Sequence, residues 1–344
     1  LRRYAVLFMT HLTLGFGLTT PVWAQDLDVS AFAQLEEDEA PAEITRNSHY
    51  VVSNELNHHI FRNYVKGLNG VFVGVGADQL YLIASWMNPD VLVPLDFDSV
   101  IVDLHRIYGV IFKSANNTKE FIAAWQKKNA AATKALIKTE LSETCKRCPR
   151  LFSQNRGTIN WRLRRTKRQY KEMKVPTFLT DETLYNQVAD LHRKGRVFPI
   201  RGDLRKDKGL RSVSRAAKQM GLPIRAVYLS NAEQYFRYGD DFRENFNQLH
   251  GDEQSLVLRT TPKGRKDTNS EDYWYYVQKV ENFKQFLAMK STRKVYNILP
   301  WKTPIADSDG RGWLLDRLPM TRGPVSFCGI DPPNNPNFKP PSDW

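Results

Sequence analysis

The feature that most constrains the fold is a short apolar run that ends in glycine and continues into a helix. Residues 70–76 read Gly-Val-Phe-Val-Gly-Val-Gly, and residues 79–88 have the composition of a short helix. Such a run, bounded by glycine, is typical of a buried strand in a parallel sheet. A second buried strand is predicted at 91–96, where Pro94 indicates a bulge or a sheet edge. This order predicts an α/β domain with a Rossmann-like sheet.

The rest of the chain continues to alternate between helix and strand. Hydrophobic periodicity predicts helices at 48–68, 99–114, 118–143, 181–194, 209–220 and from about Ala232, and strands at 196–203, 224–230 and 254–260. Residues 273–288 are aromatic and fit either a strand or a helix. We therefore predict a mostly parallel sheet with helices on both faces over residues 48–320. Residues 115–195 form a helical and basic insertion, and residues 321–344 an irregular tail.

The N-terminus has the order of a secretory signal peptide. Arg2 and Arg3 precede an uncharged, mostly apolar run, and Val22 and Ala24 occupy the −3 and −1 positions of a cleavage site. We predict cleavage after Ala24, followed by a flexible acidic leader at 25–47. This predicts an exported, periplasmic protein by either the Sec or the twin-arginine route. The alternatives are that residues 1–24 form an N-terminal helix of the fold or an uncleaved anchor. Without a signal peptide, we expect a cytoplasmic protein.

The overall charge is strongly basic. The net charge is +13. Hydrophobic residues make up 41% of the chain, which is typical of a folded globular protein rather than of a disordered one. Lysine and arginine concentrate at 146–174, where Trp161 and Tyr170 lie among them and Glu172 is the single acid. Such a stretch is either a solvated helix face or loop, or a surface that binds nucleic acid or an anionic membrane through phosphate contacts.

Cys145 and Cys148 lie three residues apart. In an oxidising compartment this spacing predicts a disulfide that staples the chain locally. The pair does not open a helix directly after a strand, so a thioredoxin-like redox site is disfavoured. No second pair of ligands has the spacing of a zinc site, and we predict no bound metal.

The glycine-rich turn is the candidate binding site. Gly74 and Gly76 let the backbone turn tightly and approach a ligand, and Asp78 and Gln79 open the helix whose N–H groups face the turn. Asp96 lies 20 residues beyond Gly76, at the end of the next strand, where an acid can accept hydrogen bonds from ribose hydroxyls. The alternative is an ordinary tight turn with a surface acid.

Further polar residues follow the later strands. Ligands of open α/β sheets collect at the carboxyl ends of the strands. Asp203 is placed there to bind an adenine amino group, and Ser230 and Asn231 to line the reacting end, with Glu233 just inside the next helix. Each of these residues is also a possible helix cap.

The order of these segments resembles class I S-adenosylmethionine-dependent methyltransferases. The resemblance rests on residues 72–76 as the first motif, Asp96 as the ribose-binding acid, Gly202 and Asp203 as the adenine-contacting motif, and residues 227–233 after the fourth strand. Residues 73–79, 228–231 and 259–260 more closely resemble an uncharacterised bacterial family with a methyltransferase-like core, over about residues 50–290. The acid that usually opens the first motif is absent, since Gly70 and Val71 stand there.

Three functions follow from these observations. The resemblance implies an enzyme that binds S-adenosylmethionine, with Ser230, Asn231 and Glu233 facing a methyl acceptor and Glu233 as the candidate base. A non-catalytic binding protein of the cell envelope would keep the fold and bind another ligand. The third hypothesis is a binder of anionic polymers or membrane surfaces through residues 146–174.

Overall fold

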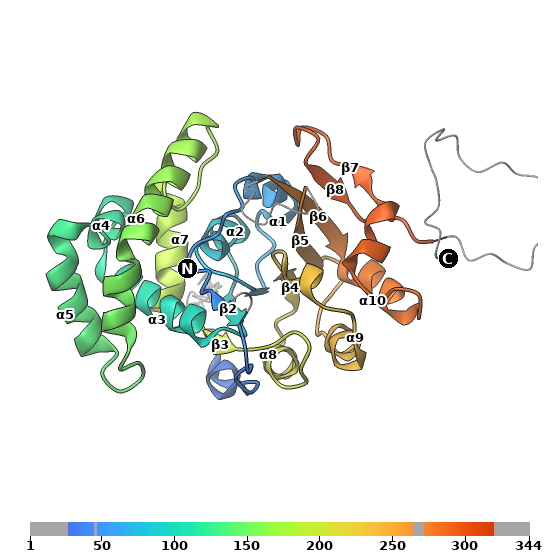
Figure 1. Ribbon diagram of the computed structural model, residues 1–344, viewed down its shortest axis with the longest axis horizontal. Coiled ribbons are helices and arrows are strands. Elements are labelled where there is room, and N and C mark those ends of the chain that lie inside the picture. The colour runs from blue at the N-terminus through green and yellow to red at the C-terminus, as the bar shows by residue number, and fades with distance from the viewer. Residues whose placement is uncertain (1–26, 45–46, 264–271, 320–344) are drawn as a thin grey trace, which may run out of the picture.

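The computed structural model describes residues 27–44, 47–263 and 272–319. The predicted signal peptide at 1–24 and the predicted tail at 321–344 lie outside these residues. The described strands form one sheet in the order β3-β2-β1-β4-β5-β6-β8-β7 (Figure 1). The strands are β1 (Val71–Gly74), β2 (Val91–Asp96), β3 (Ile200–Arg201), β4 (Ile224–Tyr228), β5 (Leu256–Pro262), β6 (Tyr273–Lys279), β7 (Thr303–Pro304) and β8 (Gly312–Leu314).

The sheet confirms the predicted Rossmann-like α/β fold. The pairs β3–β2, β2–β1, β1–β4 and β4–β5 are all parallel. β6 then pairs antiparallel with β5 and parallel with β8. The strand order reverses between β1 and β4, which is the switch point where ligands of this fold class bind. The carboxyl end of β1, and hence the glycine-rich turn, lies at this point.

Successive side chains of the strands point to opposite faces of the sheet and pack into two separate cores. Phe72 and Leu92 join one apolar cluster, whereas Val71, Val73 and Val93 join the other. The first core is covered by α2 (Gln79–Met87), α3 (Ser99–Ser114) and helices of the insertion, and the second by α8 (Gly209–Gln219), α9 (Asp240–Asn247) and α10 (Val280–Ala288). Because both faces are covered, the strands are buried along nearly their whole length, as their near-continuous apolar sequences require.

The insertion is helical, but the single helix predicted at 118–143 is wrong. The structure has α4 (Thr118–Ala124), a 3₁₀ turn at Lys127–Asn129, α5 (Ala130–Glu140), α6 (Cys148–Glu172) and α7 (Glu182–Arg193). At the break, the side chain of Asn129 donates to Ala123 O at 2.8 Å and Thr133 donates to Ala124 O at 3.0 Å. These side chains satisfy carbonyl groups at the end of α4 and allow α5 to start in a new direction.

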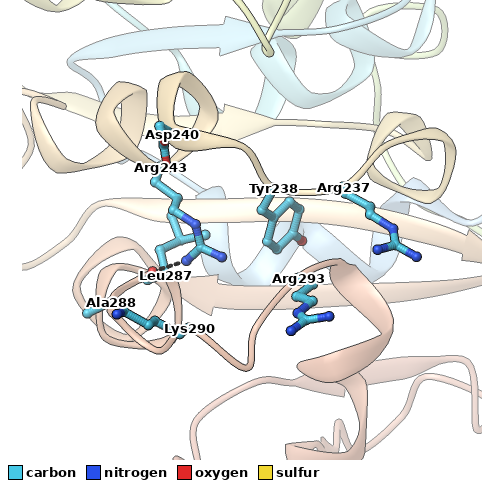
Figure 2. A pocket seen from close by; sticks show the side chains of 8 residues that line it. All are labelled: Arg237, Tyr238, Asp240, Arg243, Leu287, Ala288, Lys290 and Arg293. Carbon is cyan, nitrogen blue, oxygen red and sulfur yellow. Dashed lines mark hydrogen bonds between the residues drawn. The ribbon is translucent and has the colours of Figure 1, made fainter.

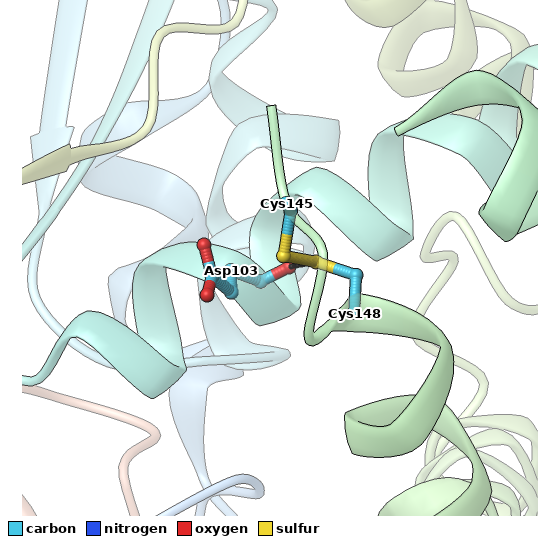
Figure 3. Close-up of side chains that lie close together, drawn as sticks. All are labelled: Asp103, Cys145 and Cys148. Carbon is cyan, nitrogen blue, oxygen red and sulfur yellow. Dashed lines mark hydrogen bonds between the residues drawn. A yellow bond between two sulfur atoms is a disulfide. The ribbon is translucent and has the colours of Figure 1, made fainter. Parts of the chain in front are cut away.

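The predicted disulfide between Cys145 and Cys148 is confirmed (Figure 3). The Cα atoms are 5.4 Å apart, and Cys148 is the first residue of α6. Asp103 of α3 lies beside the bridge, and its carboxylate pairs with Arg106 and Arg147. The bridge staples the turn before α6, and the Arg147–Asp103 ion pair joins this turn to α3.

The helix predicted at 48–68 is also wrong over most of its length. Only a 3₁₀ turn at His58–Phe61 and the short α1 (Arg62–Val65) are helical. Residues 51–57, which we call the strap, run as irregular chain over the carboxyl end of the sheet. Tyr275 OH accepts from the N–H groups of Leu56 and Asn57 at 3.0 and 2.7 Å. These long-range bonds replace the local bonds of a helix.

The acidic leader packs against the domain, which its composition does not predict. A 3₁₀ turn at Ser30–Gln34 buries Phe32, and the Asp38 N–H donates to Arg201 O of β3 at 3.0 Å. The Asp38 carboxylate accepts from the N–H groups of Asp203, Lys208 and Gly209. It therefore caps the N-terminus of α8, which has no cap from its own side chains.

Smaller departures have local causes. Pro94 lies in β2 where the ladder to β3 has a gap, between the Leu92–Val197 bridge and the Leu95–Ile200 pair, so its missing N–H removes no hydrogen bond from a paired stretch. Residues 273–288 contain both a strand, β6, and a helix, α10. After β4 the chain forms a 3₁₀ turn at Ala232–Tyr235 before α9 begins, and further 3₁₀ turns lie at Val295–Asn297 and Leu299–Trp301. In the described part of the chain, no helix combines the length and apolarity needed to cross a membrane.

Candidate functional site at the carboxyl edge of the sheet

Gly74 and Gly76 are needed for two different reasons. A Cβ at Gly74 would lie 2.4 Å from the Leu80 side chain, so glycine allows α2 to pack directly against β1. Gly76 has a φ of +106°, a conformation that side-chain-bearing residues rarely adopt. Its carbonyl accepts from His105 Nε2 at 2.8 Å, which holds the turn against α3.

The turn brings Gly76 and Asp96 together, as the sequence spacing predicts. Gly76 N–H donates to one carboxylate oxygen of Asp96 at 3.2 Å, and Asp98 N–H donates to the other at 2.9 Å. No cation is paired with Asp96 in the described residues. Burial raises the pKa of Asp96 to about 7, and the charge of Asp98 adds to the rise, while the two backbone donors oppose it. The carboxylate therefore lacks a strong partner of its own.

A second N–H of the turn is occupied by a side chain. Ala77 N–H donates to Gln79 Oε1 at 3.0 Å. Together with Gly76 N–H, which is directed to Asp96, two N–H groups of the turn already have acceptors within the protein. Gln79 therefore helps to close the turn through its own side chain.

Asp78 ties the turn to distant parts of the chain and is not open to a ligand. Its carboxylate accepts from Ser53 N–H of the strap at 2.8 Å and from Arg162 Nε of α6 at 2.9 Å. Both side chains of the ion pair are almost fully buried. Arg162 also donates to Glu55 O at 2.9 Å, so that it joins the turn, the strap and α6.

A buried carboxylate that the sequence did not single out lies beside the predicted site. Glu55 accepts hydrogen bonds from Ser230 at 2.8 Å, from Tyr228 and Thr260, and from His58 Nε2 at 2.9 Å. Burial acts to raise the pKa of Glu55, but the contacts with His58, Thr260 and Tyr228 outweigh it and hold this pKa below its ordinary value. We call these five residues the Glu55 cluster.

The Glu55 cluster lies beside the switch point, over β4 and β5. Tyr228 is the last residue of β4, Ser230 follows it by two residues, and Thr260 belongs to β5, so their hydroxyls meet at the carboxyl edge. The one available signal in the sequence was hydroxyl residues at the ends of neighbouring strands. Nothing in the sequence indicated that an acid 175 residues before Ser230 joins them.

The remaining predicted residues divide between two places. Asn231 lies near the switch point, where its side chain and that of Asn54 are within hydrogen-bonding distance of Tyr273 OH, at 3.5 and 2.9 Å. Asp203 is held in a bidentate pair by Arg205, with contacts of 2.9 and 2.6 Å. It lines a separate hollow of about 520 Å³ with leader residues 39–43.

Glu233, the candidate base, is placed away from Ser230. It is 2% exposed and pairs with the buried Arg259, with Nε and carboxylate oxygen 2.7 Å apart. Arg259 lies over the Phe283 ring, in the core beneath α9 and α10. Burial raises the pKa of Glu233 despite Arg259 and Tyr238. This placement makes Glu233 part of the core rather than of an open site.

A basic hollow of about 430 Å³ lies between the start of α9 and the end of α10 (Figure 2). Arg237, Lys290 and Arg293 line it, and Arg243 forms part of its wall by donating to Leu287 O and Thr292 O. Neither of the two hollows described contains residues of the 74–79 turn. They are therefore distinct from the predicted ligand site.

The fold and the turn define a Rossmann-like α/β protein with its candidate site at the switch point. Residues 50–312 match the model of the family described as "Domain of unknown function (DUF7790)". The match covers more than half of the chain, so the protein belongs to this family. A comparison of the chain with curated proteins found no match.

The contribution of the turn to stability gives a first prediction. Gly76→Ala is expected to lower the free energy of unfolding by about 1–3 kcal/mol, because alanine is strained at the positive φ of Gly76. Gly157→Ala in α6 is the control, since its Cβ meets no atom within 4 Å. It should raise the stability by about 0.5–1 kcal/mol. Urea denaturation of both variants measures the difference; equal effects would contradict this account of the turn.

Proposed function

We propose that the carboxyl edge at the 74–79 turn binds a nucleoside-type ligand whose ribose hydroxyls donate to Asp96. The observation that carries the proposal is the state of Asp96: it is buried, it has only two backbone donors, and it has no paired cation among the described residues. A ribose diol supplies the donors that such a carboxylate lacks.

S-Adenosylmethionine is the first ligand to consider. It carries no phosphate, which agrees with a turn in which the N–H groups of Gly76 and Ala77 already donate to Asp96 and Gln79. When bound, it supplies an activated methyl group. In this proposal Asp96 orients the ribose and the 74–79 turn contacts the ligand. Ser230 and Asn231 lie on the side where a methyl acceptor would bind.

A binding protein without catalysis is the second candidate, and a specific observation favours it. The groups predicted to act on an acceptor are occupied: the Ser230 hydroxyl donates to Glu55, and Glu233 is paired with Arg259 in the core. Formation of S-adenosylhomocysteine from S-adenosylmethionine in the presence of a cell extract would identify a transferase. Binding of both compounds without such turnover would identify a binding protein.

The ionisation of Asp96 predicts how binding depends on pH. Affinity for S-adenosylhomocysteine should rise as the pH increases through about 7, because the ionised carboxylate is the stronger acceptor. Asp96→Asn should bind about ten- to a hundredfold more weakly, for a charged hydrogen bond of about 1.5–3 kcal/mol, and without this pH dependence. Calorimetric titration between pH 5 and pH 9, about two units on either side of 7, measures both.

The same shift has a defined effect on stability. Because the folded-state pKa of Asp96 is raised from 3.8 to about 7, folding favours the protonated form, and stability is lost as the pH rises between these values. Asp96→Asn should therefore gain stability relative to the unchanged protein above pH 7. Asp190→Asn, at an exposed position of α7, is the control for both experiments. If Asp96→Asn and Asp190→Asn bind S-adenosylhomocysteine with equal affinity, Asp96 does not bind the ribose.

A further inference from the structure

The outer face of α6 is a single continuous stripe. Its members recur every three or four residues, so that they share one side of the helix: Arg150, Gln154, Gly157, Trp161, Arg164, Arg168 and Lys171. The apolar side chains of α6 face the protein instead: Leu151, Phe152, Ile159, Leu163 and Tyr170 are buried. With a rise of about 1.5 Å per residue, the stripe is about 32 Å long.

The stripe carries positive charge with little compensation. Between Lys146 and Lys171 the sequence contains no acid, and Glu172 is the first to follow. Arg150, Arg164, Arg168 and Lys171 have no ion pair with any of the described residues. By contrast, the inner Arg162 is paired with Asp78, and Arg147 with Asp103. The outer cations are therefore available to an anionic partner.

An exposed tryptophan lies in the middle of these charges. Trp161 is 55% exposed, and the Arg165 guanidinium lies 5.3 Å from the centroid of its ring. A helical side chain leans over the preceding turn, which here contains Gly157. Nothing lies within 4 Å of the position of a Gly157 Cβ, so the surface of the preceding turn is open. The exposed part of the Trp161 ring can therefore stack on a planar group, with Arg165 beside it.

We infer that the outer face of α6 binds single-stranded nucleic acid. Arg164, Arg168 and Lys171 contact successive phosphates, and Trp161 stacks on an unpaired base, which combines the two features of sequence-independent single-strand binding. A duplex offers no open base face to the ring. An anionic membrane is a poorer fit, because Trp161 is the one large apolar side chain on the stripe, and membrane-surface helices bury a wide apolar face. This inference does not depend on the nucleoside site.

The experiment measures binding of the full chain to a labelled single-stranded oligonucleotide over a series of salt concentrations. In Arg164→Ala/Arg168→Ala, the slope of log affinity against log salt should become shallower by about 1.4, for two lost phosphate contacts. The control Lys218→Ala/Lys290→Ala removes the same charge from exposed positions outside α6 and should keep the slope.

Trp161→Ala tests stacking separately from charge. It should weaken binding by about five- to 150-fold without changing the slope, and Trp161→Phe should retain most of the affinity. Unchanged thermal melting of each variant shows that the fold is intact. The inference is overturned if Trp161→Ala binds normally, if the control double variant changes the slope equally, or if duplex or phosphatidylglycerol vesicles bind more tightly than the single strand.

Discussion

Replacing Arg162 with methionine is expected to lower the free energy of unfolding by about 3–5 kcal/mol, the usual effect of removing one partner of a buried ion pair. Arg162 is 2% exposed, and its guanidinium donates to Asp78 and to Glu55 O at 2.9 Å in each case. Methionine fills much of the same volume but leaves the Asp78 carboxylate buried without its cation. The loss should be visible in urea denaturation.

Arg164→Met is the matched control for Arg162→Met. It makes the same substitution half a turn away on the exposed face of α6, where changes are usually within about 0.5 kcal/mol. The double variant Arg162→Met/Asp78→Asn removes both charges and should recover part of the stability. If Arg162→Met and Arg164→Met unfold at the same urea concentration, the ion pair does not stabilise the protein.

Glu55→Ala should have an effect of similar size for a different reason. Each buried donor left without an acceptor costs about 1–3 kcal/mol. Glu55→Ala removes the carboxylate that accepts hydrogen bonds from the hydroxyls of Tyr228, Ser230 and Thr260 and from His58. We expect a loss of several kcal/mol. Glu140→Ala, at the exposed end of α5, is the control and should leave stability nearly unchanged.

The pH dependence identifies the role of the Glu55 charge. Because its folded-state pKa lies below the ordinary value of 4.5, the stability it contributes is present above pH 4.5 and is lost as the pH falls below it. Glu55→Gln keeps the shape of the side chain, so its deficit relative to the unchanged protein should shrink on acidification. A deficit that stays constant from neutral to acidic pH would mean that the charge plays no part.

The positions of several strands along the chain could be predicted from the sequence because buried parallel strands have a distinct composition. Residues 71–74, 91–96 and 224–228 are apolar runs bounded by glycine, proline or charge, and each forms a strand close to the predicted bounds. The strap could not be predicted in this way. Leu56, Ile60 and Tyr64 have helical spacing, but hydrogen bonds to Tyr275 and Asp78, far along the chain, hold residues 53–57 in an irregular form.

The site was predictable only where its residues belong to neighbouring strands. Asp96 and Gly76 meet because a fixed spacing places them at the ends of β1 and β2. Glu55 and Arg162 reach the same region from the strap and from α6, and sequence spacing carries no information about such contacts. Glu233 follows β4 directly, but Arg259 attracts it into the opposite core.

The leader has a further consequence for association between molecules. β3 is a two-residue strand at one end of the sheet, and an open strand edge is a template for pairing with another chain. Asp38 donates its N–H to Arg201 O, while Glu36 and Glu37 pair with Arg215 and Arg201 at the same border. The leader thus blocks lateral growth of the sheet with a short, charged stretch of the same chain. A protein trimmed past Asp38 would expose that border and acquire a route to strand-mediated self-assembly.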